Sequence, residues 1–211
     1  MNMKPGFSQI VLVIDDDESM RVGLNYLFQS MDLPVKMFSS AAEFLKTELP
    51  EIPSCLVLDI RLPGVNGLEF QDILGKAGRH IPIIFITGHG DIPMSVRAMK
   101  AGAVDFLTKP FRDQDMLDAV TRALDLDRKR RAGDQALSDL RRRFESLSAR
   151  EREVLSHATA GLMNKQTAGV LKLSEITVKI HRMNLMKKMQ ARSLAQLVKM
   201  AQALGIGTAN P

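Results

Sequence analysis

The chain contains 211 residues, of which 45% are hydrophobic and 25% are charged, a balance that excludes wholesale disorder. This length allows one large or two small domains. The longest aliphatic run, residues 10–14, is too short to cross a membrane and ends in acids, so we expect neither a membrane span nor a secretory signal. Because Cys55 is the only cysteine, no internal disulfide can form, and a reducing cytoplasm is the expected location.

Charge is divided unevenly between the two halves of the chain. Residues 1–122 contain 12 Lys and Arg and 16 Asp and Glu, whereas residues 123–211 contain 17 and 8. The net charges of −4 and +9 indicate two modules with different partners. Nucleic acid fits the basic module, although a basic linker or tail explains the same charge. The absence of Trp and the single Tyr speak against a stacking platform for single-stranded nucleic acid.

In the first half, short apolar runs alternate with segments of helical spacing. Strands are expected at residues 10–14, 35–38, 55–59, 81–87 and 104–108. Helices are expected at residues 19–30, from residue 40, up to about residue 76, at 92–101 and from about residue 113. Turns are expected at Pro63–Gly64 and Asn66–Gly67, before the third of these helices. This alternation predicts an α/β fold with a doubly wound, five-stranded parallel sheet of the flavodoxin-like kind. Ligands of such sheets bind at the carboxyl ends of the strands.

Polar side chains follow the predicted strands at the edge where ligands bind. They are Asp15, Asp16 and Asp17 after the first strand, Asp59 at the end of the third, Thr87 at the end of the fourth and Lys109 after the fifth. Clustered carboxylates raise one another's pKa unless a cation intervenes, and a hard, oxygen-liganded ion such as Mg2+ suits them. Lys109 and Thr87 can bind the oxygens of a phosphoryl group attached to a carboxylate. One such residue alone is more often a cap or turn residue, but the ordered set indicates a site.

The first half resembles the receiver domain of bacterial two-component response regulators over about residues 8–125. The resemblance rests on the acid run after the first strand, on Leu58–Gly64, on Thr87–Asp91 and on Lys109–Phe111. It implies that a sensor histidine kinase is a partner, and that the kinase transfers a phosphoryl group from its phosphohistidine to Asp59.

The resemblance also assigns roles to the residues around Asp59. Asp16 would bind Mg2+ directly and Asp15 through water, with Asp59 and the backbone carbonyl of Arg61 completing the protein ligands. Thr87 and Lys109 would bind phosphoryl oxygens, and Phe106 would be the aromatic residue that switches position. Asp17 matches no ligand position.

An enzyme is the alternative for this half. Asp15 and Asp17 after an apolar strand, with Thr87 and Lys109, also fit the first three motifs of haloacid-dehalogenase-type phosphatases. Asp15 would then be the nucleophile and Asp17 the general acid and base. That family needs a further acidic pair on another strand, whereas this chain turns basic and helical after Lys109, and Asp59 would have no role. A receiver that dimerises constitutively or senses a ligand is a further alternative.

The second half is predicted to be helical, with each helix opened by a polar cap. The expected caps are Ser148 in a capping-box pattern with Glu151, Asn164 for a short helix, Ser174 for a helix over about residues 175–189, and Ser193 for the last helix. Four short helices without strands predict an all-α domain that contains a helix-turn-helix.

The helix over residues 175–189 is the expected recognition helix. With Val178 at the centre of the buried face, Leu185 and Met189 share that face at helical spacing. Ile180 and Met183 point the opposite way, where they suit contact with thymine methyl groups in a major groove. The expected DNA-binding residues are Lys165, Thr177, Lys179, Ile180, Arg182, Met183 and Lys187, with Lys165, Arg182, Lys187 and the neighbouring Lys188 as phosphate contacts. A partly exposed helix with merely solubilising charges is the alternative.

Residues 145–204 resemble the LuxR/NarL/FixJ-type DNA-binding domain. The resemblance rests on Leu147–Leu155, Gly161–Lys165, Leu173–His181 and Ala191–Leu194, with small departures at Thr167 and Lys172. The two resemblances together imply a response regulator of the FixJ/NarL kind, with a receiver at residues 1–125, a helical linker at 126–146 and a DNA-binding domain at 147–211. Such a protein is a transcription regulator that binds double-stranded promoter DNA, not a metabolic enzyme.

The resemblance further implies a homodimer. In many relatives the dimer surface is the fourth helix, fifth strand and fifth helix of the receiver, here about residues 92–125. Suitable ion pairs between two copies would join Arg97 or Lys100 of one to Asp113, Asp115 or Asp118 of the other. RNA polymerase is a further possible partner of the DNA-bound protein.

The linker carries its own apolar pattern. Leu137, Leu140, Phe144 and Leu147 fall at 3-4-3 spacing, which suits a coiled-coil seam and a helix folded back on its own domain equally well. Gly133 is expected to break or bend the connection to the receiver.

Overall fold

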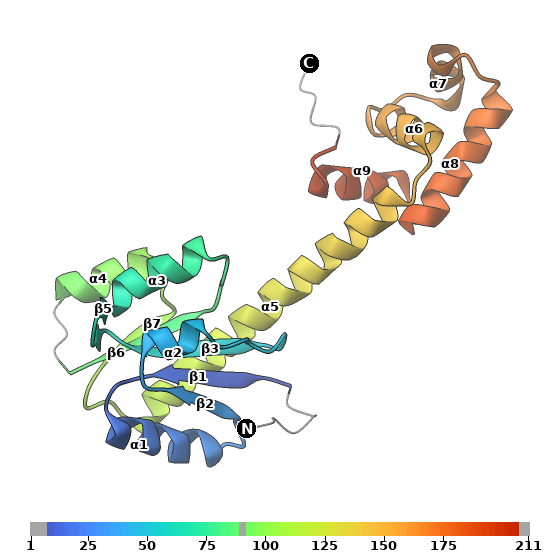
Figure 1. Cartoon of the computed structure of the whole chain (residues 1–211). Helices are drawn as coiled ribbons and strands as arrows, with labels where there is room; N and C mark the ends of the chain where they lie inside the picture. The colour runs from blue at the N-terminus through green and yellow to red at the C-terminus, as the bar shows by residue number, and fades with distance from the viewer. Residues whose placement is uncertain (1–7, 89–91, 207–211) are drawn as a thin grey trace. The chain divides into compact units, whose positions relative to one another are not determined.

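The computed structural model describes residues 8–88 and 92–206 (Figure 1). The chain forms two compact units and passes from the first to the second between Arg131 and Ala132. His89, Gly90 and Asp91, which belong to one of the receiver-like motifs, lie outside the described residues. Within the described ranges, no helix is long and apolar enough to cross a membrane.

The first unit is built on one parallel sheet with the strand order β2-β1-β3-β6-β7. The strands are β1 (Ile10–Ile14), β2 (Val35–Phe38), β3 (Ser54–Asp59), β6 (Ile83–Thr87) and β7 (Asp105–Thr108). Every residue of β1, β3 and β6 is buried, as expected for central strands covered on both faces. The predicted α/β fold is confirmed, with only the starts of three strands displaced by one or two residues.

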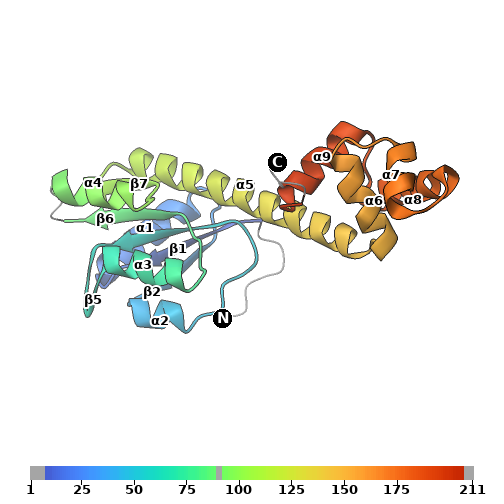
Figure 2. The same cartoon turned by 90° about the horizontal axis from the view of Figure 1, so that it is seen from above.

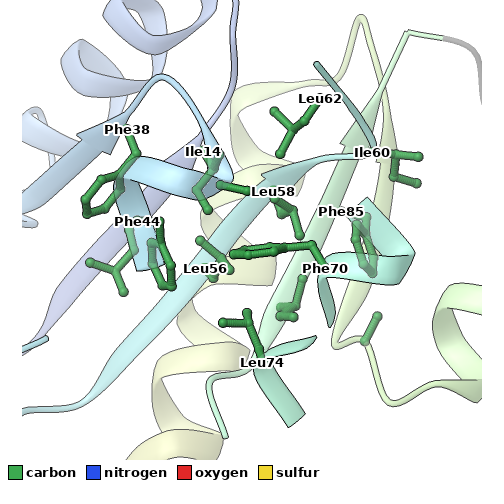
Figure 3. Close-up of a cluster of buried hydrophobic side chains, with 14 of the residues drawn as sticks. Ile14, Phe38, Phe44, Leu56, Leu58, Ile60, Leu62, Phe70, Leu74 and Phe85 are labelled. Carbon is green, nitrogen blue, oxygen red and sulfur yellow. The ribbon is translucent and has the colours of Figure 1, made fainter. Parts of the chain in front are cut away.

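Helices cover both faces of this sheet. They are α1 (Glu18–Gln29), α2 (Ala41–Leu45), α3 (Gly67–Lys76), α4 (Ile92–Lys100) and the receiver part of α5 (Asp113–Glu145). Side chains of α2, α3 and α4 pack on one face, and side chains of α1 and α5 pack on the other. Figure 3 shows the first of these cores, in which Phe44 of α2 meets the ring of Phe70 of α3 edge to face at 5.9 Å.

A small hairpin follows the central strand. The strands β4 (Arg61–Leu62) and β5 (Val65–Asn66) pair antiparallel around Gly64, which has a φ of +84°. The turn was predicted from Pro63 and Gly64, but the two short strands were not. At the end of the hairpin, a Cβ on Gly67 would lie 2.8 Å from Ile60 Cα and 2.9 Å from the carbonyl oxygen of Asp59, so only glycine lets α3 begin this close to the strand.

The helix α5 runs without interruption from Asp113 to Glu145, as Figure 2 shows. The expectation that Gly133 breaks the connection is therefore wrong. A glycine inside a helix costs about 1 kcal/mol relative to alanine, which is too little to end a helix that is held at both ends. Nothing lies within 4 Å of the position a Cβ would take at Gly133.

The second unit consists of the end of α5 and four further helices: α6 (Ala149–Thr159), α7 (Asn164–Leu171), α8 (Glu175–Met189) and α9 (Leu194–Ala203). The predicted all-α domain is confirmed. Ser148, Ser174 and Ser193 are helix caps as expected, and Ser148 forms a complete capping box with Glu151.

Asn164 does not cap α7 as expected. Met163 occupies the cap position, and Gln166 Oε1 accepts the Met163 N–H at 2.8 Å. The side chain of Asn164 instead accepts a hydrogen bond from Arg182 of α8, at 3.0 Å, so its polar group serves the packing of two helices. Lys172 ends α7 in the left-handed conformation (φ +54°), which explains why glycine would suit that position.

The apolar residues of the linker pack within the second unit. Leu140 and Phe144 contact its core, and Leu147 is buried in it. These contacts support the helix folded against its own domain, the second of the two alternatives for the 3-4-3 pattern.

Candidate phosphoacceptor site and DNA-binding surface

Two carboxylates and an ammonium group meet at the carboxyl edge of the sheet. Asp15 follows β1, Asp59 ends β3, and Lys109 follows β7. Lys109 Nζ lies 2.8 Å from Asp15 Oδ2 and 2.6 Å from Asp59 Oδ2. Asp15 is fully buried and Asp59 nearly so, while part of Lys109 is exposed. Strand order brings these three residues together, because β1 and β3 are neighbours and β7 lies one strand beyond β6.

Backbone groups orient both carboxylates. The Asp17 N–H donates to Asp15 Oδ1 at 2.9 Å, and the Arg61 N–H donates to Asp59 Oδ1 at 2.8 Å. Each carboxylate therefore has one oxygen held by the chain just after its strand and the other turned toward Lys109. The role expected for the Arg61 carbonyl stays a prediction.

Burial and charge act against each other at this edge. Burial raises the pKa of Asp15, and this effect outweighs the opposing hydrogen bond from Lys109. For Lys109, burial favours the neutral amine, but the hydrogen bonds and charges of Asp15 and Asp59 outweigh it and raise the pKa. The lysine therefore stays protonated at neutral pH and compensates the two carboxylates.

A third carboxylate completes an acidic cluster. Asp16 is exposed, and one oxygen each of Asp15, Asp16 and Asp59 can lie within 4.8 Å of one another. Three carboxylate oxygens at this spacing fit a hard divalent cation such as Mg2+. Asp17 has a different use, since its side chain accepts the N–H groups of Ser19 and Met20 and caps α1.

Thr87 and Phe106 lie on the two strands that follow β3 in the sheet order, Thr87 on β6 beside β3 and Phe106 on β7 at the edge. Thr87 is buried at the end of β6, and its carbonyl oxygen accepts the Lys109 N–H at 2.7 Å. Phe106 is half-buried on β7, beside Phe85, and packs against the core shown in Figure 3. The Lys109–Pro110 peptide bond is cis.

Two contributors to this site were not predicted. Gly67 permits the close approach of α3 to Asp59, and Arg21 of α1 donates to the carbonyl oxygen of Asp15 at 2.7 Å. The Asn-Gly dipeptide at residues 66–67 was assigned only to a turn. No local pattern marks Arg21, because its contact depends on how α1 returns over β1.

The recognition helix α8 has the predicted buried and exposed faces. Val178, Leu185 and Met189 are buried in the core of the second unit. Ile180 is 49% exposed and Met183 63% exposed, and Ile176 on the same side is 73% exposed. Large apolar side chains are rarely left in water on one face without a partner.

The predicted DNA-binding residues differ in how free their polar groups are. Lys165, Lys179 and Lys187 are exposed. Arg182 is half-buried and bonds Asn164, and the Thr177 hydroxyl lies 2.8 Å from that of Ser174 at the start of α8. The ammonium group of Lys188, one of the expected phosphate contacts, lies 2.7 Å from Glu151 Oε2 and so ties α8 to α6.

An acidic strand-edge site on a doubly wound sheet, followed by a helix-turn-helix domain with an exposed recognition helix, defines a DNA-binding response regulator. Comparison with known proteins supports this class. Residues 11–121 match the response regulator receiver domain, and residues 145–201 match the bacterial regulatory proteins of the luxR family. The chain therefore belongs to the response regulator family, in the group with a LuxR-type DNA-binding domain.

Proteins of similar sequence match this chain along most of their own length. Nodulation protein W of Bradyrhizobium diazoefficiens is 58% identical, over 93% of this chain and 87% of that protein. The transcriptional regulatory protein FixJ of Rhizobium meliloti is 45% identical, over 93% and 97%. The solved structure of the response regulator StyR matches with a TM-score of 0.84 and 48% identity, over 93% of this chain and 99% of that one. The chain is thus a transcriptional response regulator, whose receiver implies a sensor kinase as partner and whose second domain implies DNA.

Proposed function

We propose that Asp59 is the phosphoacceptor of this regulator, which a sensor histidine kinase phosphorylates in the cytoplasm. The observation that carries the proposal is the Lys109 ammonium group, 2.6 Å from Asp59 and 2.8 Å from Asp15. An oxygen of Asp59 would attack the phosphorus of a phosphohistidine, the P–N bond would break, and the imidazole would leave. Lys109 and Thr87 would then bind oxygens of the transferred group.

The acidic cluster is the proposed Mg2+ site. Asp15, Asp16 and Asp59 would hold the ion, with the Arg61 carbonyl as a further ligand. When bound, the ion neutralises charge on the phosphoryl oxygens and on the carboxylates. The ammonium group of Lys109 forms ion pairs with both members of the buried pair, Asp15 and Asp59.

The phosphatase alternative loses support from three observations. Asp17, its proposed general acid and base, is used as the cap of α1. From Pro110 to Ile206, which the structure describes throughout, the chain forms helices and no further strand to carry a second acidic pair. Asp59, which that alternative leaves without a role, contacts Lys109 directly.

Phosphorylation is proposed to act through Thr87 and Phe106 on a dimer surface. Phosphoryl oxygens on Asp59 would draw Thr87 inward, and Phe106 would move toward the space left behind. The surface lies on α4, β7 and the start of α5, where Ile92, Val96 and Met99 are exposed. Asp115 already bonds Arg112, just before α5, and Asp118 already bonds Gln114 within the helix, so Asp113 is the acid best placed to meet Arg97 of a second copy.

In the proposed complex with promoter DNA, α8 lies in the major groove. Lys179, Ile180 and Met183 would contact bases, the two apolar side chains meeting thymine methyl groups. Lys165, Lys187 and Arg182 would contact phosphates, with Thr177 beside the start of the helix. A dimer places two such helices on half-sites about one helical turn apart, and the bound protein would be within reach of RNA polymerase.

Intact mass spectrometry tests the phosphoacceptor. The full chain is incubated with Mg2+ and either acetyl phosphate or phosphoramidate, and any adduct is mapped to a peptide. We expect one phosphoryl group on the peptide that contains Asp59, absent from Asp59→Ala. An adduct on Asp15 would support the phosphatase instead, and no adduct with either donor would contradict the proposal.

A further inference from the structure

A third buried carboxylate of the receiver, besides Asp15 and Asp59, lies at the other end of the strand that carries Asp59. Asp127 of α5 has no exposed surface. Its Oδ2 accepts the N–H of Ser54 at 2.9 Å and Nε of Arg131 at 2.7 Å. Its Oδ1 accepts Nε and Nη2 of Arg130, at 3.0 and 2.7 Å. Such full compensation is what a buried charge requires.

The contact with Ser54 joins segments far apart in the chain. Ser54 is the first residue of β3, and Asp59 is the last. Asp127 thus attaches α5 to the central strand of the sheet, just before the chain leaves the first unit at Arg131. The hydrogen bonds from Ser54, Arg130 and Arg131 outweigh burial and lower the pKa of Asp127, so the attachment is ionic at neutral pH.

Beyond this attachment, α5 passes through an exposed stretch. Residues 132–136 are all exposed, and they include Gly133. The next apolar anchors are Leu140 and Phe144, which pack in the second unit. A short exposed helical segment is only marginally stable in water, so this part of α5 depends on its two fixed ends.

We propose that Asp127, with Arg130 and Arg131, is a positioning cluster that keeps α5 helical as it leaves the receiver, and that signal transfer from Asp59 to the DNA-binding domain depends on it. This inference rests on the proposed function. A helix that frays after Asp127 would connect the domains by a flexible chain. Changes at the receiver would then no longer bias the domain that binds DNA.

Amide hydrogen exchange of the full chain, read by mass spectrometry, tests the first part. Asp127→Asn keeps the size of the side chain and removes its charge, and Arg131→Gln removes one partner while Arg130 remains. Both should speed exchange in residues 128–139 by about tenfold, with residues 10–14 of β1 unchanged. Lys129→Gln is the matched control, because Lys129 is exposed and lies on the same turn of α5.

The second readout is the gain in DNA affinity on phosphorylation, measured by anisotropy on a duplex that the wild type selects from a random pool. Asp127→Asn should be phosphorylated as fast as wild type, yet lose about fivefold or more of that gain. Unchanged exchange in both variants, or a full gain in Asp127→Asn, would overturn the inference. If neither the wild type nor the control variant gained DNA affinity on phosphorylation, the proposed function itself would be contradicted.

Discussion

At the level of single residues, Lys109 decides the electrostatics of the receiver site. Its ammonium group contacts two carboxylates that would otherwise repel each other at close range. The same group is placed to meet the negative charge that would develop in the proposed phosphorylation of Asp59. Lys109 would then have one role before the reaction and another during it.

Replacing Lys109 with Gln should slow phosphorylation of Asp59 by acetyl phosphate by about a hundredfold, the usual cost of losing one charged donor to a developing anion. The rate is measured as the growth of the phosphorylated intact mass at fixed Mg2+. Lys76→Gln changes an exposed lysine of α3 and should leave the rate unchanged. Equal rates for Lys109→Gln and wild type would show that Lys109 is not in the site.

The apolar side chains of α8 permit a test at the scale of one methyl group. Replacing thymine with uracil in a duplex selected by the wild type removes only the 5-methyl group. Losing a buried methyl costs about 0.8 kcal/mol, or about fourfold in affinity, at each position that Ile180 or Met183 contacts. Met183→Ala should bind the matching thymine and uracil duplexes equally, whereas Val170→Ala on α7 should discriminate like wild type. If the wild type bound the thymine and uracil duplexes with equal affinity at every position, contacts between α8 and the thymine methyl groups would be excluded.

The sequence predicted which residues meet in the receiver site where that meeting follows from their places at the ends of strands. Asp15, Asp59 and Lys109 meet because parallel strands end at one edge, and the spacing of apolar runs reveals that edge. The pairs Arg182–Asn164 and Lys188–Glu151 join different helices. Their formation depends on how helices cross in space, and local spacing carries no such information.

Among the elements, α6 depends on an ion pair at its first turn between the buried Glu151 and the exposed Lys188. Glu151 Oε2 accepts the N–H of Ser148 at 2.7 Å and lies 2.7 Å from Lys188 Nζ of α8. Burial opposes ionisation of Glu151, but the hydrogen bonds from Lys188 and Ser148 outweigh it and lower the pKa. One side chain thus caps α6 and ties it to the recognition helix.

Glu151→Gln should lower the free energy of unfolding of the second unit by about 1 kcal/mol at pH 7. Because the pKa of Glu151 is lower in the folded chain than its ordinary value of 4.5, this contribution is complete above that value. It disappears as the pH falls through the folded-state pKa, so the two proteins should converge in acid. Urea unfolding followed by circular dichroism measures the difference at pH 7 and pH 4.

Glu153→Gln is the control for this prediction, since Glu153 is an exposed partner of Arg150 and should contribute little. A difference between Glu151→Gln and wild type that stays constant with pH would mean that charge is not involved.

The boundaries of elements were predictable where a cap or turn residue marks them. Three serines predicted the starts of α6, α8 and α9 correctly. The side chain of serine is short, so its hydroxyl oxygen accepts hydrogen bonds from N–H groups close by in the chain, such as those of the first helical turn. Gly133 and Asn164 led to wrong predictions. Glycine is typical of the end of a helix, but Gly133 lies inside α5. Asparagine is typical of the position just before a helix, but Asn164 is the first residue of α7. Other contacts hold both helices. The strands β4 and β5 are too short to show an apolar pattern.

At the level of the whole molecule, the division of charge matches the division into two units. The acidic half carries the strand-edge carboxylates, and the basic half carries the exposed lysines of α7 and α8. Part of the positive charge at the boundary has a structural use, because Arg130 and Arg131 compensate Asp127. Charged residues that pair within the protein must therefore be subtracted from the net charge of a segment before that charge is used to predict a binding partner.

Dimerisation can be tested by reversing one charge on α4. If Arg97 meets Asp113 of a second copy, Arg97→Glu should weaken the dimer of the phosphorylated protein by about tenfold, through like-charge repulsion. Sedimentation equilibrium measures the dissociation constant. The double variant Arg97→Glu with Asp113→Arg should recover the dimer, and Lys46→Glu, at an exposed position just after α2, serves as the control. A dimer of unchanged strength in Arg97→Glu would place the interface elsewhere.

The central claim is that phosphorylation of Asp59 controls DNA binding, and one titration tests it most directly. The affinity of the full chain for a duplex that it selects from a random pool is measured by fluorescence anisotropy, with and without acetyl phosphate and Mg2+, for wild type and for Asp59→Asn. We predict that the donor raises the affinity of the wild type about tenfold or more and leaves Asp59→Asn unchanged. An equal rise in Asp59→Asn, or no rise in wild type that mass spectrometry shows to be phosphorylated, would contradict the account.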